Sequence, residues 1–193
     1  MNNKTLKIAM VGLLAALSYI AFTFFQVKVT VAGGTTSFHL GNTFALLGAL
    51  LVGGVPGGIA ASIGMGIGDI LDPIYITVAP KTIILKLFIG IVCGFFAHRI
   101  IKIKTKEGKN LTMGVVASCT MGMLFNIICE PIFSYFYTSF ILGLPEKAAA
   151  TLAGMNLVTT SVNAVLSIIL ATIFYLALHK KLSNSGMIEK LLK

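Results

Sequence analysis

Two stripes of polar residues lie in otherwise apolar segments, and they are the residues best suited to do chemistry. Asn126 and Glu130 are four positions apart, so they share one face of a helix. A second stripe, spaced by three, four and seven positions, consists of Asn156, Thr159, Thr160 and Asn163. Amides, hydroxyls and a carboxylate hydrogen-bond small polar molecules, and burying them in apolar surroundings is costly. We therefore expect both stripes to face a common binding pocket.

Aromatic residues directly follow the first stripe. Pro131 lacks a backbone N–H group and predicts a break in the helix after Glu130. Beyond it the chain carries Phe133, Tyr135, Phe136, Tyr137 and Phe140. Aromatic rings beside amides and a carboxylate suit a pocket for a small, flat, polar ring. Two alternatives stay open, because buried amides also hold helices together and Glu130 can serve in a proton relay.

The composition places these stripes in a membrane protein. The 193 residues are 56% hydrophobic and 11% charged, with a mean hydropathy of +0.95. A soluble domain is about a quarter charged, so a soluble enzyme, a disordered chain and a disulfide scaffold are excluded. A membrane-spanning helix needs roughly 20 apolar residues. One membrane domain over residues 1–193 is expected, with spans at 6–26, 43–55, 57–71, 82–101, 111–137 and 151–178.

The breaks and the basic residues set the topology. The glycines around Pro56 predict a tight turn between two short spans, which form a helical hairpin. With six spans, most basic residues fall on one side, namely Lys4, Lys7, Arg99, Lys102, Lys104, Lys106, Lys109, Lys180, Lys181, Lys190 and Lys193. The positive-inside rule then predicts an all-α integral membrane protein with both termini in the cytoplasm. The two polar stripes would lie in the outer half of the bilayer.

Several functions lack the residues that they require. The net charge of +9 is explained by topology and by anionic lipid headgroups, so no nucleic-acid partner is expected. The three cysteines and three histidines show no ligand spacing, which predicts neither a metal site nor a cofactor. The sequence contains no phosphate-binding loop. If the protein drives uphill transport, the energy must come from elsewhere.

Segments of the first half resemble a known transporter family. They are Phe38-His39-Leu40-Gly41-Asn42-Thr43, the run from Leu50 to Gly58, Gly64-x-Gly66-Ile67-Gly68-Asp69, and Ala79-Pro80-Lys81-Thr82 with Lys86. In this order they resemble the substrate-binding S component of energy-coupling factor (ECF) vitamin transporters, above all its riboflavin, pyridoxine and hydroxymethylpyrimidine branch. Asn42 departs from the pattern, which usually has Asp at this position.

The resemblance implies a fold, partners and candidate site residues. It implies six helices, cytoplasmic termini, and an outward-facing pocket closed by the loop 27–41, in the plasma membrane of a prokaryote. The implied partners are a membrane scaffold subunit, which docks on Ala9, Gly12 and Ala16 of the first helix, and two ATPase subunits. Together with the stripes, it gives the candidate substrate-binding residues Phe38, His39, Asn42, Lys81, Asn126, Glu130, Tyr135, Asn156, Thr160 and Asn163.

The expected substrate is a small hydroxylated heterocycle. Glu130 can accept a hydrogen bond from a protonated pyridine or an aminopyrimidine, and the amides can bind ring hydroxyls. This favours a vitamin B6 form such as pyridoxine, with hydroxymethylpyrimidine or riboflavin as alternatives. A stand-alone secondary transporter is a further alternative, although we detect no internal repeat. An intramembrane enzyme using Glu130, Asp69 or Asp72 is the least favoured, because the two aspartates suit a loop or capping role.

Overall fold

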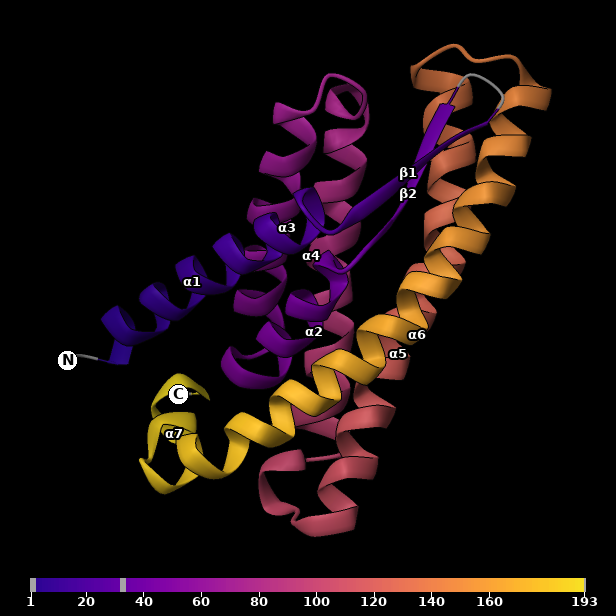
Figure 1. Ribbon diagram of the computed structural model, residues 1–193. Coiled ribbons are helices and arrows are strands. Elements are labelled where there is room, and N and C mark those ends of the chain that lie inside the picture. Colours follow the sequence, from indigo (N-terminus) through magenta and orange to yellow (C-terminus); the bar gives the residue numbers. More distant parts are fainter. Residues whose placement is uncertain (1–2, 32–33, 193) are drawn as a thin grey trace.

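The computed structural model describes residues 3–31 and 34–192, and these are almost entirely helical (Figure 1). The helices are α1 (Asn3–Thr23), α2 (Gly41–Val52), α3 (Gly54–Leu71), α4 (Ala79–Phe95), α5 (Gly108–Phe136), α6 (Glu146–Asn184) and α7 (Met187–Leu192). Short segments of other helix types are η1 (Ile76–Val78), η2 (Phe96–Ile100), η3 (Ile103–Thr105) and η4 (Tyr137–Ile141). The antiparallel strands β1 (Gln26–Val31) and β2 (Gly34–His39) follow α1.

Five helical stretches in the described residues are long and apolar enough to cross a membrane. They are Asn3–Thr23, Gly54–Leu71, Ile76–Ile100, Gly108–Ile141 and Glu146–Asn184. Helix α2 is apolar and almost wholly buried, but its 12 residues extend only about 18 Å, against a hydrocarbon core of about 30 Å. Six spans therefore stay a prediction, in which α2 would be the short one.

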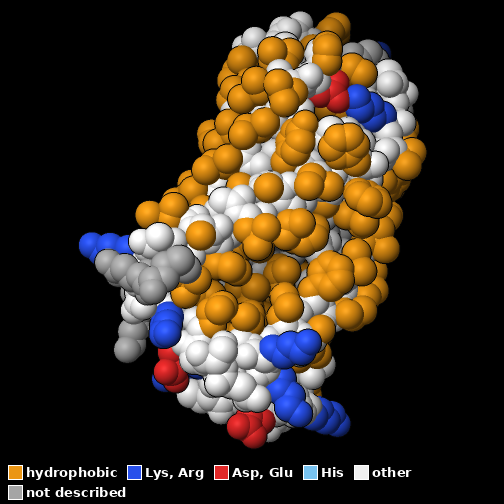
Figure 2. Space-filling model, turned by 60° about the vertical axis from the view of Figure 1, so that its left-hand side comes forward, with side chains coloured by type: hydrophobic (Ala, Val, Ile, Leu, Met, Phe, Trp, Pro, Cys, Tyr) orange, Lys and Arg blue, Asp and Glu red, His pale blue; other side chains and the backbone are white. Residues whose placement is uncertain are grey.

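The outer surface has the character expected of a membrane protein. Figure 2 shows hydrophobic side chains over most of one face, with the charged side chains gathered toward the ends. Helix α7 packs against α1 and α2, so elements near the two ends of the chain meet on one side of the molecule. Of the expected basic cluster, Lys193 lies outside the described residues.

The loop expected at 27–41 is largely a β-hairpin, which the all-α prediction missed. Helix α1 ends at Thr23, three residues before the predicted end, and the chain turns into β1 at Gln26. The two strands pair from Gln26 opposite His39 to Val31 opposite Gly34. Strand β1 is rich in β-branched residues, which favour extended backbone. Positions 32 and 33 of the expected loop lie outside the described residues.

The helical hairpin predicted around Pro56 is confirmed, but its break lies at Gly53. Gly53 has a φ of 97°, a conformation that favours glycine, and α3 begins at the next residue. Pro56 lies in the first turn of α3, where a missing N–H group costs no helical hydrogen bond. A Cβ atom on Gly57 would lie 2.3 Å from the backbone nitrogen of Ala49, so α2 and α3 are in backbone contact beside the turn.

Glycines also bring α3 and α4 into backbone contact. A Cβ atom on Gly90 would lie 2.4 Å from the Cα atom of Gly58, and one on Gly94 would lie 2.3 Å from the Cα atom of Gly54. Each helix therefore presents two glycines four residues apart, and the two pairs face each other in antiparallel order. These glycines therefore serve the internal packing of the helices.

The break predicted at Pro131 is wrong. Helix α5 continues through Pro131 to Phe136, and η4 follows it directly. Proline is tolerated within membrane helices because neighbouring helices and side chains satisfy the freed backbone groups. The consequence is that the residues after Pro131 keep the helical periodicity of those before it.

The contact between α3 and α4 leads to a first prediction. We expect Gly90→Ala to lower the thermal unfolding midpoint in detergent, because its Cβ atom meets backbone rather than a movable side chain. Overpacking of this kind costs about 1–3 kcal/mol. A thiol-reactive dye reports the transition, since Cys93 and Cys119 are buried in the folded protein.

Gly154→Ala is the matched control, because a Cβ atom there meets nothing within 4 Å. It should leave the midpoint unchanged or raise it slightly, since alanine favours helix over glycine. Equal midpoints for the two variants would contradict the proposed packing.

Candidate functional site

A polar cavity of about 90 Å³ lies where β2 meets the ends of five helices. Its polar lining residues are Thr35, Thr36, Ser37, His39, Asp69, Tyr75, Lys81, Thr82, Lys86, Glu130, Ser134, Thr138, Asn156, Thr159, Thr160 and Asn163. The apolar residues that line it are Phe22, Val78 and Leu152. So polar a lining inside a membrane protein is typical of a site for a polar ligand.

The two polar stripes meet in this cavity. Glu130 lines it from α5, and Asn156, Thr160 and Asn163 line it from α6. The amide Nδ2 of Asn156 donates a hydrogen bond to Ser134 Oγ at 2.6 Å, which joins the two helices. The segment η4, which continues α5, contributes Thr138. Because α5 is not broken, the spacing of four that links Asn126 and Glu130 extends to Ser134 and Thr138, which the predicted break concealed.

Asn163 fastens β2 to α6. Its Oδ1 atom accepts a hydrogen bond from the backbone N–H of His39 at 3.0 Å. Its Nδ2 atom donates to the backbone carbonyl of Ser37, also at 3.0 Å. The hydroxyls of Thr36 and Thr159 form a further bond of 2.7 Å. Side chains of α6 thus satisfy backbone groups at the outer edge of the strand. These bonds hold the hairpin over the cavity.

An ion pair crosses the cavity from α4 to α5. The Nζ atom of Lys81 lies 2.5 Å from Glu130 Oε1, and the two side chains are only 8% and 12% exposed. The other carboxylate oxygen of Glu130 is buried without a hydrogen-bond partner among the described residues. This arrangement leaves one acceptor of the pair available to a ligand.

Two further charged residues of the cavity were not among the predicted site residues. Lys86 on α4 is 7% exposed, and in the described part of the chain it has neither a hydrogen bond nor an ion pair within 4 Å. Asp69 on α3 is 2% exposed, and its Oδ2 atom has no partner among the described residues. The cavity therefore holds a buried cation and a buried anion that are not paired with each other.

The loop or capping role expected for Asp69 is wrong, whereas that of Asp72 is confirmed. Helix α3 extends to Leu71, so Asp69 lies in its last turn and faces inward. Asp72 Oδ1 accepts the backbone N–H of Ile74 at 3.0 Å, and its other oxygen pairs with Lys28 of β1. The Lys28 ammonium lies 5.2 Å from the ring centroid of Tyr75. These contacts tie β1 to the connection between α3 and α4.

A family model matches nearly the whole chain. Residues 2–180 match the family model described as ECF-type riboflavin transporter, S component. The chain belongs to this family. No curated protein and no solved structure matches the chain. The resemblance found in the first half is confirmed and extends over nearly the whole sequence. The protein is thus a multi-pass membrane protein of a family of substrate-binding transporter subunits.

In this S component, His39 is a buried, neutral residue at the cavity. Its ring packs edge to face on Phe22 with 4.8 Å between centroids, and its Nδ1 atom accepts the backbone N–H of Gly41 at 3.2 Å. Burial, and after it the charge of Lys86, lowers the pKa of His39 well below its ordinary value. The proton therefore lies on Nε2, which makes the ring a donor at that atom.

Four of the predicted site residues lie outside the lining of the S component's cavity. Asn42 and Asn126 are buried in the helices, each with an amide oxygen that has no partner among the described residues. Phe38 is half-buried on β2. The hydroxyl of Tyr135 donates to Glu146 Oε1 at 3.4 Å.

The expectation that the aromatic residues enclose the pocket is wrong. Phe133, Phe136 and Phe140 are exposed on the outside of the S component, where they border an apolar groove together with Tyr137. The unbroken helix explains this, because these rings fall outside the stripe of Glu130, Ser134 and Thr138 and turn away from the cavity.

The hydrogen bonds of Asn163 lead to a second prediction. We expect Asn163→Ala to speed amide hydrogen exchange in residues 34–39, because two buried bonds to β2 are lost. A cost of about 1–3 kcal/mol corresponds to roughly 5- to 150-fold faster exchange. Mass-spectrometric detection of deuterium uptake gives this measurement for the strand and the helices separately.

The control is Asn184→Ala, the same substitution at an exposed position near the end of α6. It should leave uptake in the hairpin unchanged. If Asn163→Ala also leaves the hairpin as protected as in the parent, the strand does not depend on this side chain.

Proposed function

We propose that this S component captures a vitamin B6 form such as pyridoxine and carries it across the membrane. The observation that supports this substrate is the charge of the cavity. Two lysines, Lys81 and Lys86, and two carboxylates, Asp69 and Glu130, lie among its lining residues. Their formal charges sum to zero, so the cavity suits a ligand that carries both signs of charge rather than a simple anion or cation.

A 3-hydroxypyridine ring has this property. In neutral water its proton moves readily from the hydroxyl to the ring nitrogen, which leaves a phenolate opposite a pyridinium N–H. We propose that Lys86 binds the phenolate, and its lack of another partner in the described residues supports this role. The free oxygen of Glu130 or of Asp69 would accept the pyridinium N–H. Charge-assisted hydrogen bonds of this kind are about twice as strong as neutral ones.

The size of the cavity also favours a single ring. A cavity of about 150 Å³ admits benzene in other proteins, and the cavity here measures about 90 Å³. A substituted pyridine requires a modest displacement of the hairpin, whereas the tricyclic ring of riboflavin requires a much larger one. Riboflavin, which the family description names, and hydroxymethylpyrimidine are the alternative substrates.

The proposal includes the topology and the partners. We propose six spans with both termini in the cytoplasm of a prokaryote, and energy supplied by a membrane scaffold subunit with two ATPase subunits. Ala9, Gly12 and Ala16 are exposed on α1, and a Cβ atom on Gly12 would meet nothing within 4 Å. A smooth helix face of this kind supports the docking role implied by the family resemblance.

The proposed substrate leads to a third prediction. In calorimetric titrations of the detergent-solubilised protein with pyridoxine, hydroxymethylpyrimidine and riboflavin, we expect pyridoxine to bind most tightly. Glu130→Gln should weaken pyridoxine binding at least tenfold, or about 1.4 kcal/mol, because it removes a charge from the site. Glu146→Gln is the matched control, since Glu146 is exposed and does not line the cavity, and it should bind as the parent does.

The possible outcomes separate the alternatives. Tighter binding of riboflavin or hydroxymethylpyrimidine would replace the proposed substrate and retain the capture function. Unchanged pyridoxine affinity in both Glu130→Gln and Asn163→Ala would remove the cavity as the binding site. Uptake in cells that lack any ECF scaffold would instead support a stand-alone transporter.

A further inference from the structure

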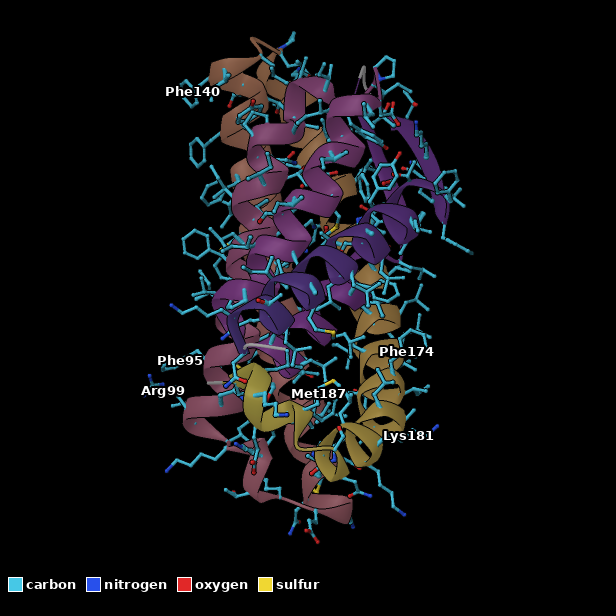
Figure 3. All side chains as sticks on the ribbon, turned by 90° about the vertical axis from the view of Figure 1, so that its left-hand side faces the viewer. Phe95, Arg99, Phe140, Phe174, Lys181 and Met187 are labelled. Atoms are coloured by element: carbon cyan, nitrogen blue, oxygen red, sulfur yellow. The ribbon has the colours of Figure 1, made fainter. Side chains whose placement is uncertain are left out.

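A second, differently charged hollow lies at the other end of the molecule. It is a groove of about 660 Å³ between the end of α4 and the turn that joins α2 to α3. Four basic side chains line this basic groove: Lys7 of α1, Arg99 of η2, Lys102 of the following turn and Lys104 of η3. Figure 3 shows Arg99 at the end of the bundle that also holds Lys181 and Met187, far from Phe140.

The charge of the basic groove is of one sign. No Asp or Glu of the described residues lines it, and none of its four basic residues forms an ion pair within 4 Å in the described part of the chain. Lys7 of α1 and the three basic residues of the stretch 99–104 repel one another where they converge. An anionic group is therefore the complementary ligand.

The walls of the groove add two features that suit a phosphate on an apolar tail. Helix α3 begins at Gly54 in the groove, and the first turn of a helix presents free N–H groups and a partial positive charge. Beside the basic residues lie Val55 and Phe95, which are 54% and 51% exposed. Phe95 is four residues before Arg99, so an apolar and a cationic side chain lie one above the other (Figure 3).

We propose that the basic groove binds an anionic phospholipid. The lipid phosphate lies among Arg99, Lys102 and Lys104 near the start of α3, and its acyl chains lie along Phe95 and Val55. A free phosphate ion would use the charges but leave the apolar wall exposed, so a lipid is the occupant that accounts for both. Basic pockets between membrane helices bind lipid headgroups in this manner.

This inference leads to a fourth prediction. Native mass spectrometry of the full chain, released from detergent with added phosphatidylglycerol, should show a bound lipid. The triple variant Arg99→Gln, Lys102→Gln, Lys104→Gln should bind it at least tenfold more weakly. Phosphatidylcholine with the same acyl chains should bind weakly to both proteins, because its headgroup has no net charge.

The matched control is the triple variant Lys109→Gln, Lys181→Gln, Lys190→Gln. These lysines are exposed and outside the groove, and the control loses the same three charges. It should retain phosphatidylglycerol binding. Equal weakening in both triple variants would show a general effect of net charge and overturn the site.

Two further measurements distinguish the remaining alternatives. Inorganic phosphate should not displace the lipid, and displacement at equal concentration would assign the groove to a free anion instead. If the triple variant does not fold, Arg99→Gln and Phe95→Ser can be measured singly, because both side chains are exposed. Each should weaken lipid binding, and parent-like binding by both would contradict the proposal.

Discussion

The cost of burying charge among apolar helices is the constraint on which the rest of this structure depends. Lys81 and Glu130 offset this cost by forming an ion pair at 2.5 Å, which joins α4 to α5 at the cavity. Asp69 and Lys86 are as deeply buried but are not paired with each other. Two buried charges without an oppositely charged partner are unfavourable for folding alone. The proposed ligand would complete the pairing, which is why the proposal gives the cavity's charges more weight than its shape.

The need to satisfy buried polar groups also explains how the β-hairpin is held in place. A two-stranded sheet is marginally stable by itself, and an unpaired strand edge is a poor covering for a polar cavity. Asn163 satisfies one N–H and one C=O group of β2, and Thr159 bonds to Thr36. The second polar stripe is therefore partly structural, because it supports the strand that closes the site. Buried side chains of α6 therefore have both roles considered above. Some of their atoms connect neighbouring elements, and others line the cavity.

Much of this architecture could be predicted from local sequence, and the failures have local causes. Long apolar runs and stripes spaced by three and four residues sufficed to predict the helices and to place Glu130, Asn156 and Asn163 in one cavity. Pro131 suggested a break because its effect on an isolated helix is large, yet packing overrides that effect in α5. Asp69 was given a loop or capping role because it lies in the last turn of the predicted span, and α3 does end at Leu71. The error concerned the direction of its side chain, which faces the cavity. The hairpin was missed although β1 alternates strictly between polar and apolar residues, which is a strand signal. Strand β2 is mostly polar and shows no such alternation, so the whole segment resembled a loop.

The strengths of these contacts indicate which part of the molecule moves when a ligand enters. The α2, α3 and α4 helices touch through backbone atoms at Gly57, Gly58 and Gly90, where even one added carbon has no room. The hairpin is held instead by a few side-chain hydrogen bonds, each worth about 1 kcal/mol, and by the partly exposed pair of Lys28 and Asp72. Local opening of the hairpin thus costs much less than any separation of the helices. The basic groove is lined by Gly54 and Gly94, which form one of these glycine contacts, so its walls belong to the closely packed helices and not to the hairpin.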